Sequence, residues 1–200
     1  MLYQIHRYPA DLIDVVYLRG ERVVIRPVLP QDAELTAAFF GGLSPRARQQ
    51  RFLSAMRSLP PGLITRLTDV DYSEHVALVA EVFRGNGETV IAEARYARRG
   101  EGESAEFAIS VAEPWQGLGL ARLLLHKLKA SAAAAGINTL VGETLATNAA
   151  MLGLARSAGF LLRPSLESRG VVLLEATLAP PDAGRPEHEP TAAAPRASAA

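Results

Sequence analysis

The sequence predicts a single domain of the α+β class, in which helices pack on a mixed sheet that contains an antiparallel meander. Short helical segments follow the first strand, three strands separated by glycine-containing turns come next, and strands then alternate with helices. With 200 residues, 48% of them hydrophobic, the chain can bury enough apolar surface to fold without disulfides.

The first half of the domain combines one strand with three short helices. Helix starts are marked by Pro30 with Asp32 and by Ser44 with Pro45, which are residue types favoured at the first helical positions. We therefore expect a strand over 23–28 and helices over 30–40, 44–53 and 58–67. The three arginines of segment 46–51 are expected to lie on a solvated helix face.

The second half begins with a three-stranded meander and ends in a strand–helix alternation. Gly136 and Gly159 each follow an apolar helical pattern, at the position where glycine commonly ends a helix. The expected strands are 76–83, 89–97, 104–111, 139–145 and 171–178, and the expected helices are 120–135 and 148–157.

The composition excludes several functional classes. Lys+Arg and Asp+Glu both number 21, so no global basic charge suggests a nucleic-acid or membrane partner. The absence of cysteine excludes a catalytic thiol and thiolate metal sites, and the four histidines show no metal-ligand spacing. We expect no metal.

The domain is expected to span residues 21–178. Residues 1–20 are interpreted as an N-terminal extension that packs on it, and the Ala/Pro-rich segment 179–200, which lacks Val, Ile, Leu and Phe, as a disordered tail. No run of 18 apolar residues and no export signal is visible, so a cytoplasmic protein, monomeric or homodimeric, is expected.

One segment carries the chemistry: the strand 104–111 leads through a glycine-containing turn into a long helix. A helix N-terminus offers unpaired N–H groups to a phosphate, and the small residues Gly117, Gly119 and Ala121 allow close approach. The Rossmann fingerprint is excluded because the third glycine is missing, and the Walker signature because no Gly-Lys-Ser/Thr is present.

The segment Gln116-Gly117-Leu118-Gly119-Leu120-Ala121 resembles the acetyl-CoA motif of the GNAT superfamily of N-acetyltransferases, Gln/Arg-x-x-Gly-x-Gly/Ala. A second block, 148–160, resembles that family's helix ending in Gly-Phe, and the resemblance spans 23–178. It implies a twisted, mostly antiparallel central sheet with helices on both faces, splayed at the motif strand. It also implies acetyl-CoA as cosubstrate, pyrophosphate on the backbone amides of the turn, and a pantetheine arm along the splayed strand.

A more specific likeness is to bacterial protein-lysine acetyltransferases that act on acyl-CoA synthetases. It is carried by segments 25–28, 71–80 and 104–109. The implied function is transfer of acetyl to a primary amine, here a protein lysine, by direct transfer with a glutamate general base. Two alternatives stay open: a small-amine acetyltransferase (polyamine, aminoglycoside or amino acid) and a non-catalytic CoA-binding sensory module.

Glu106 is the candidate base. A carboxylate inside an apolar strand is costly unless it faces a wet cleft, and the position matches the family's glutamate. Asn148 is a candidate for the cofactor arm and is also a favoured helix N-cap. The full set of candidate cofactor-binding residues is Ile109, Val111, Gln116, Gly117, Leu118, Gly119, Leu120, Ala121, Arg122 and Asn148.

The acceptor end is expected to be acidic, because negative potential attracts an amine cation. Glu143 and Asp71 are the candidate substrate residues, within an expected acidic cluster of Asp69, Asp71, Glu103, Glu106 and Glu143. Tyr72 and Tyr96 are candidates for a general acid only by exclusion.

Overall fold

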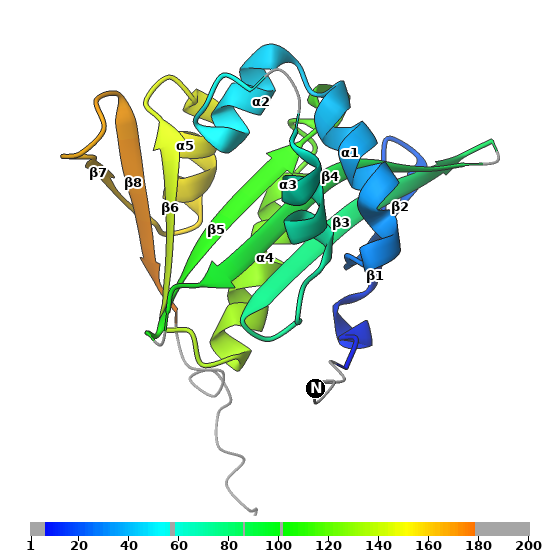
Figure 1. Ribbon diagram of the computed structural model, residues 1–200, viewed down its shortest axis with the longest axis horizontal. Coiled ribbons are helices and arrows are strands. Elements are labelled where there is room, and N and C mark those ends of the chain that lie inside the picture. The colour runs from blue at the N-terminus through cyan, green and yellow to red at the C-terminus, as the bar shows by residue number, and fades with distance from the viewer. Residues whose placement is uncertain (1–6, 57–58, 86, 101, 179–200) are drawn as a thin grey trace, which may run out of the picture.

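The computed structural model describes residues 7–56, 59–85, 87–100 and 102–178. In this part of the chain one sheet has the strand order β1-β2-β3-β4-β5-β6-β8-β7 (Figure 1). Neighbouring strands are antiparallel except β5 and β6, which are parallel. The predicted fold class is confirmed. The strands are β1 (Asp14–Leu18), β2 (Glu21–Pro27), β3 (His75–Arg84), β4 (Gly87–Arg98), β5 (Ser104–Val111), β6 (Thr139–Leu145), β7 (Leu161–Pro164) and β8 (Val171–Thr177).

Helices cover both faces of the sheet: α1, α2 and α3 lie on one face and α4 on the other (Figure 1). None of the helices within the described ranges is long and apolar enough to cross a membrane. Their bounds are α1 (Ala33–Gly42), α2 (Pro45–Phe52), α3 (Pro61–Thr68), α4 (Leu120–Ala134) and α5 (Ala149–Ser157), with short 3₁₀ turns at Ala10–Leu12, Pro30–Asp32 and Glu113–Trp115.

Strand alternation divides the core into two clusters. On β5, Ala105 and Phe107 point toward α4 and α5 and belong to the larger cluster. On β3, Ala77 and Val79 point to the opposite face and pack with Phe40 of α1 in the smaller one. Consecutive side chains of a strand such as β5 therefore point to opposite faces of the sheet.

The observed elements differ from the sequence prediction mainly at the ends of the domain. Asp14–Leu18, expected as an extension, is β1 and pairs antiparallel with β2. The strand β7 was not predicted, and α3 begins only at Pro61, since proline favours the first turn of a helix. Ser58 and the predicted tail 179–200 lie outside the described residues.

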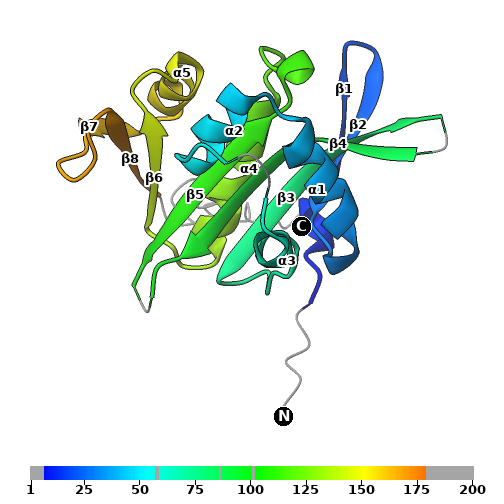
Figure 2. The ribbon, with the colours of Figure 1, turned by 45° about the horizontal axis from the view of Figure 1, so that its top comes forward.

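β5 and β6 pair over only three residues each. The parallel ladder runs from Ser104↔Thr139 to Glu106↔Val141 and ends there. Beyond it β6 diverges from β5, and α2 and α5 lie near the diverging ends (Figure 2). The splayed sheet implied by the family resemblance is therefore present, and it opens directly after Glu106.

Candidate active site

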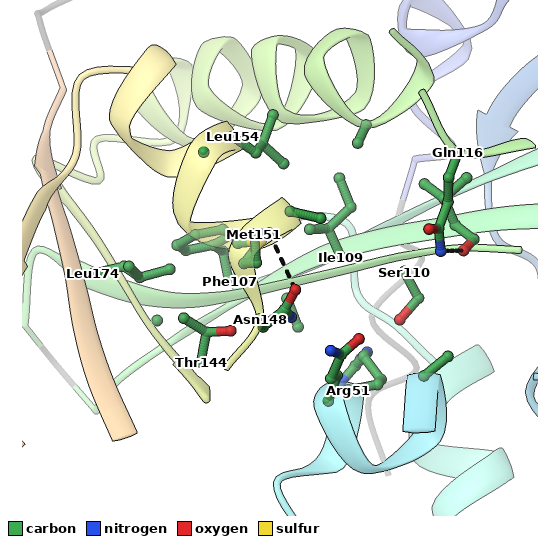
Figure 3. A pocket seen from close by; sticks show the side chains of 18 of the residues that line it. Arg51, Phe107, Ile109, Ser110, Gln116, Thr144, Asn148, Met151, Leu154 and Leu174 are labelled. Atoms are coloured by element: carbon green, nitrogen blue, oxygen red, sulfur yellow. Dashed lines mark hydrogen bonds between the residues drawn. The ribbon is translucent and has the colours of Figure 1, made fainter. Parts of the chain in front are cut away.

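A cavity of about 760 Å³ occupies the space between the diverging strands. Its walls come from β5, β6, α2, α4 and α5, with α2 on one face of the sheet and α4 and α5 on the other (Figure 3). The cavity therefore connects the two faces of the sheet at the point where β5 and β6 separate. Two ligands that react with each other can thus enter the cavity from opposite faces of the sheet.

One end of the cavity lies at the N-terminus of α4. Gly117 and Gly119 both have positive φ, +75° and +83°, and a Cβ built on either would meet no atom within 4 Å. This open space beside the unpaired N–H groups of a helix N-terminus is suited to a phosphate. Arg122, in the first turn of α4, also lines the cavity and adds positive charge.

The edge of β5 that faces the cavity is ready to pair with an extended ligand. The Ala112 N–H donates to the Ile91 carbonyl (2.8 Å), which fixes the hydrogen-bonding phase between β4 and β5. Because antiparallel partners alternate, the backbone groups of Ile109 and Val111 point away from β4, toward the side from which β6 has diverged. The Gln116 side-chain amide donates to the Val111 carbonyl (2.9 Å) and so ties the turn to the strand.

The wall formed by α5 begins at Asn148. Its Oδ1 accepts a hydrogen bond from the Met151 N–H (3.2 Å), so Asn148 is the N-cap of α5 and also lines the cavity. The remainder of this wall is largely apolar, with Phe107, Leu154 and Leu174. An uncharged ligand segment fits this part of the cavity better than a charged one.

Glu106 lies on the face of β5 opposite to Phe107, together with Ser110. Its side chain is about half exposed, and its Oε2 accepts a hydrogen bond from Arg99 (3.0 Å). Glu143 of β6 is also exposed and lines the cavity. Two carboxylates therefore border the mouth on the side of α2.

Arg51 of α2 is held in place at this mouth. Its guanidinium lies over the rings of Phe40 and Phe52, 5.6 and 4.9 Å from their centroids, and pairs with Glu93 (3.4 Å). Burial alone would raise the pKa of Glu93, but the Arg95 and Arg51 guanidiniums hold that pKa below its ordinary value. The expectation of a solvated face for 46–51 is wrong at Arg51, because aromatic rings and a buried carboxylate enclose it.

Most of the predicted site residues meet in this cavity. Leu118 is an exception, since it packs against the larger core cluster. Asp71 does not line the cavity either: its Oδ1 accepts three backbone N–H bonds in its own turn, and we leave it out of the proposed site. The predicted residues in the lining are Glu106, Ile109, Val111, Gln116, Gly117, Gly119, Leu120, Ala121, Arg122, Glu143 and Asn148.

The acidic cluster and the tyrosines are placed differently from expectation. Of the five acidic residues expected at the acceptor end, only Glu106 and Glu143 line the cavity. The hydroxyl of Tyr72 donates to the Val28 carbonyl (2.8 Å), and Tyr96 is fully buried away from the cavity, so neither is placed as a general acid. Within the described ranges, no group of three or more His, Asp or Glu side chains could hold a metal ion.

Residues 48–160 match the model of the acetyltransferase (GNAT) family. This match covers more than half of the chain and includes both β5 and α5. The chain belongs to the GNAT acetyltransferase family. As a member it is an acetyltransferase, and acetyl-CoA is the acyl donor that this family uses.

Relatives within the GNAT family support this placement. Acetyltransferase PA5475 from Pseudomonas aeruginosa is 34% identical over 142 residues, which cover 71% of this chain and 76% of that protein. Acetyltransferase Pat from Mycolicibacterium smegmatis is 33% identical over 171 residues, 85% of this chain and 50% of that protein. The chain thus spans half the length of that Pat.

Two solved structures are also similar to this chain. The GNAT domain of S. lividans PAT has a TM-score of 0.77 and 32% identity, covering 86% of this chain and 100% of that one. A cAMP-binding acyltransferase from Mycobacterium smegmatis has a TM-score of 0.58 and 30% identity, covering 87% of this chain and 50% of that one.

The sequence prediction missed Arg51, Gly142 and Thr144, all of which line the cavity. Arg51 was noticed only as part of a basic run. Gly142 and Thr144 alternate with Glu143 on β6, so the strand prediction itself placed them together on one face. That alternation was the available signal.

Proposed function

We propose that this protein transfers the acetyl group of acetyl-CoA to a primary amine, and that the acceptor is a lysine side chain of a protein. The observation that carries the proposal is the cavity between β5 and β6, which extends from the glycines at the N-terminus of α4 to the carboxylate of Glu106. The proposed phosphate site and the proposed general base would thereby share one continuous space.

Each step of the proposed transfer has residues of this chain assigned to it. Acetyl-CoA supplies a thioester carbonyl that is open to nucleophilic attack. A lysine ammonium has a pKa of about 10.4 and must lose a proton before its nitrogen can attack. Glu106, on the acceptor side, takes that proton directly or through water. Gly117, Gly119 and Arg122 hold the phosphates.

The backbone of β5 would orient the thioester. The N–H groups of Ile109 and Val111 face the cavity, where they can stabilise the oxygen that gains negative charge as the new C–N bond forms. The C–S bond then breaks, and the products are the N-acetylated amine and CoA. Leu120, Ala121 and Gln116 complete the wall around the turn.

Similarity to the Pat proteins favours a protein acceptor. The chain is 32% and 33% identical to proteins named PAT and Pat, over 86% and 85% of its own length. The exposed carboxylates of Glu106 and Glu143 border the acceptor side and suit the cation of a lysine and of a small amine alike, so charge does not distinguish the two acceptors.

The test is a thiol-release assay with acetyl-CoA and three acceptors at equal concentration: a purified acyl-CoA synthetase, spermidine and free lysine. We expect the protein acceptor to be turned over far faster, with acetyl-lysine found by mass spectrometry. Turnover of spermidine or an aminoglycoside without protein labelling would support the small-amine alternative. Binding of acetyl-CoA without turnover of any acceptor would support a non-catalytic CoA-binding module.

A further inference from the structure

Thr144 carries a buried hydroxyl without a protein partner. The residue lies on β6 and is 1% exposed, and its Oγ1 makes no hydrogen bond within the part of the chain that the structure describes. A buried hydroxyl normally has a partner, because burying one unpaired costs free energy. Such a group in a cavity wall points to a ligand.

The position of this hydroxyl narrows the chemistry of that ligand. Figure 3 shows the Thr144 oxygen turned toward the cavity, on the side of Asn148. The Asn148 Oδ1 is already engaged by the Met151 N–H (3.2 Å). Phe107 and Leu174 form the apolar surroundings. A charged group without a counterion would be too costly here, so the partner must be polar and uncharged.

We infer that the Thr144 hydroxyl binds an amide of the pantetheine arm of the acyl-CoA donor. This inference rests on the proposed function. A donor with its phosphates at Gly117 and Gly119 and its thioester near Glu106 must cross the region between the diverging strands. The arm that makes this crossing carries amides along its length, whereas its one hydroxyl lies at the end next to the phosphates. A hydroxyl matches an amide because each can both donate and accept a hydrogen bond.

The experiment compares Thr144→Val with the wild-type protein by calorimetric titration of two ligands. Valine keeps the shape of threonine and removes the hydroxyl. Affinity for acetyl-CoA should fall about 5–10-fold, the effect of one lost hydrogen bond. Affinity for adenosine 3′,5′-bisphosphate, which keeps the 3′-phosphate and the first 5′-phosphate of CoA but has no pantetheine arm, should stay unchanged. The Tm of the ligand-free variant should rise, because the unpaired hydroxyl is gone.

Thr36 provides a matched control. It lies on α1 and is 2% exposed, and its Oγ1 likewise has no hydrogen-bond partner among the described residues, but it is outside the cavity lining. Thr36→Val should raise the Tm in the same direction and change neither affinity. Thr144→Ser, which keeps a hydroxyl, should bind acetyl-CoA more tightly than Thr144→Ala. This pair replaces the valine variant if that variant does not fold.

The outcomes separate this inference from the proposed function. Equal acetyl-CoA affinity in the wild type and Thr144→Val would overturn the role of Thr144 and leave the proposed function standing. An equal loss of affinity for both ligands would also overturn it, because the defect would then not concern the arm. A wild-type protein that binds neither ligand would refute the proposed function and this inference together.

Discussion

Gly142 and Phe107 face each other at the point where β5 and β6 separate. A Cβ on Gly142 would lie 2.7 Å from Cε1 of Phe107 and 3.2 Å from its carbonyl oxygen. The ring of Phe107 packs in turn against Phe160, with centroids 4.9 Å apart, so it has little room to move aside. The missing side chain at 142 therefore leaves room for the ring beside the point where the strands separate.

Gly142→Ala should therefore destabilise the fold. The added methyl group overpacks a filled site, and we expect the free energy of unfolding to fall by about 1–3 kcal/mol in chemical denaturation. Gly153→Ala is the control, since no atom lies within 4 Å of its added Cβ and it sits within α5. The free energy of unfolding of that variant should rise by up to about 1 kcal/mol. Equal stability of Gly142→Ala and wild type would contradict the packing described.

Gly119→Val should weaken acetyl-CoA binding by an order of magnitude or more. The valine side chain would fill the open space beside the N–H groups of α4, and the φ of +83° would add backbone strain. Gly136, at the other end of α4, has a φ of +75° and lies outside the cavity lining. Gly136→Val should lose similar stability but keep its affinity in calorimetric titration. Equal affinity losses in the two variants would argue against a phosphate site at Gly119.

The stability of the fold should depend on pH through His75. Burial and the Arg95 guanidinium, whose Nη1 lies 3.0 Å from Nε2, lower the pKa of His75 below its ordinary value of 6.5. The unfolded chain thus takes up the proton first, and the contribution of His75 is complete above pH 6.5 and is lost as the pH falls through the folded-state pKa. Denaturation curves should therefore show lower stability toward pH 5.

His75→Gln is the variant that isolates this effect. Glutamine offers a neutral acceptor to Arg95 and does not titrate, so stability should fall less between pH 7 and pH 5. The nearby carboxylates of Asp71 and Glu93 have pKa values held below their ordinary 3.8 and 4.5, so their contributions change at lower pH. The same slope in both proteins would show that His75 is not the responsible group.

How well the sequence predicts a strand depends on where that strand lies in the sheet. β5 and β6 occur at the predicted residues, because apolar residues alternate along β5 and turns bound both strands. β1 and β7 escaped prediction because they are edge strands, short and partly exposed, so their hydrophobic pattern is weak. For such strands pairing with a neighbour, rather than local sequence, decides the structure.

The residues of the candidate site also differ in how well the sequence predicts them. The turn 116–122 was predictable, because its backbone chemistry is encoded in consecutive residues. Arg51 was not, because segments far apart in sequence enclose it. For Thr144 the alternation along β6 was an available signal. Asp71 was grouped with other acidic residues, although its role in a turn is a common one for aspartate and was open to prediction.

The most direct test of the account is the turnover of Glu106→Gln. Glutamine keeps the size of the side chain and loses its basicity, so kcat should fall about 10²–10⁴-fold while the Kd for acetyl-CoA stays unchanged. Loss of the exposed contact with Arg99 should have little effect on stability. Glu175→Gln, an exposed substitution on β8 outside the cavity, should behave as wild type. Wild-type kcat in Glu106→Gln would contradict the assignment of Glu106 as the base.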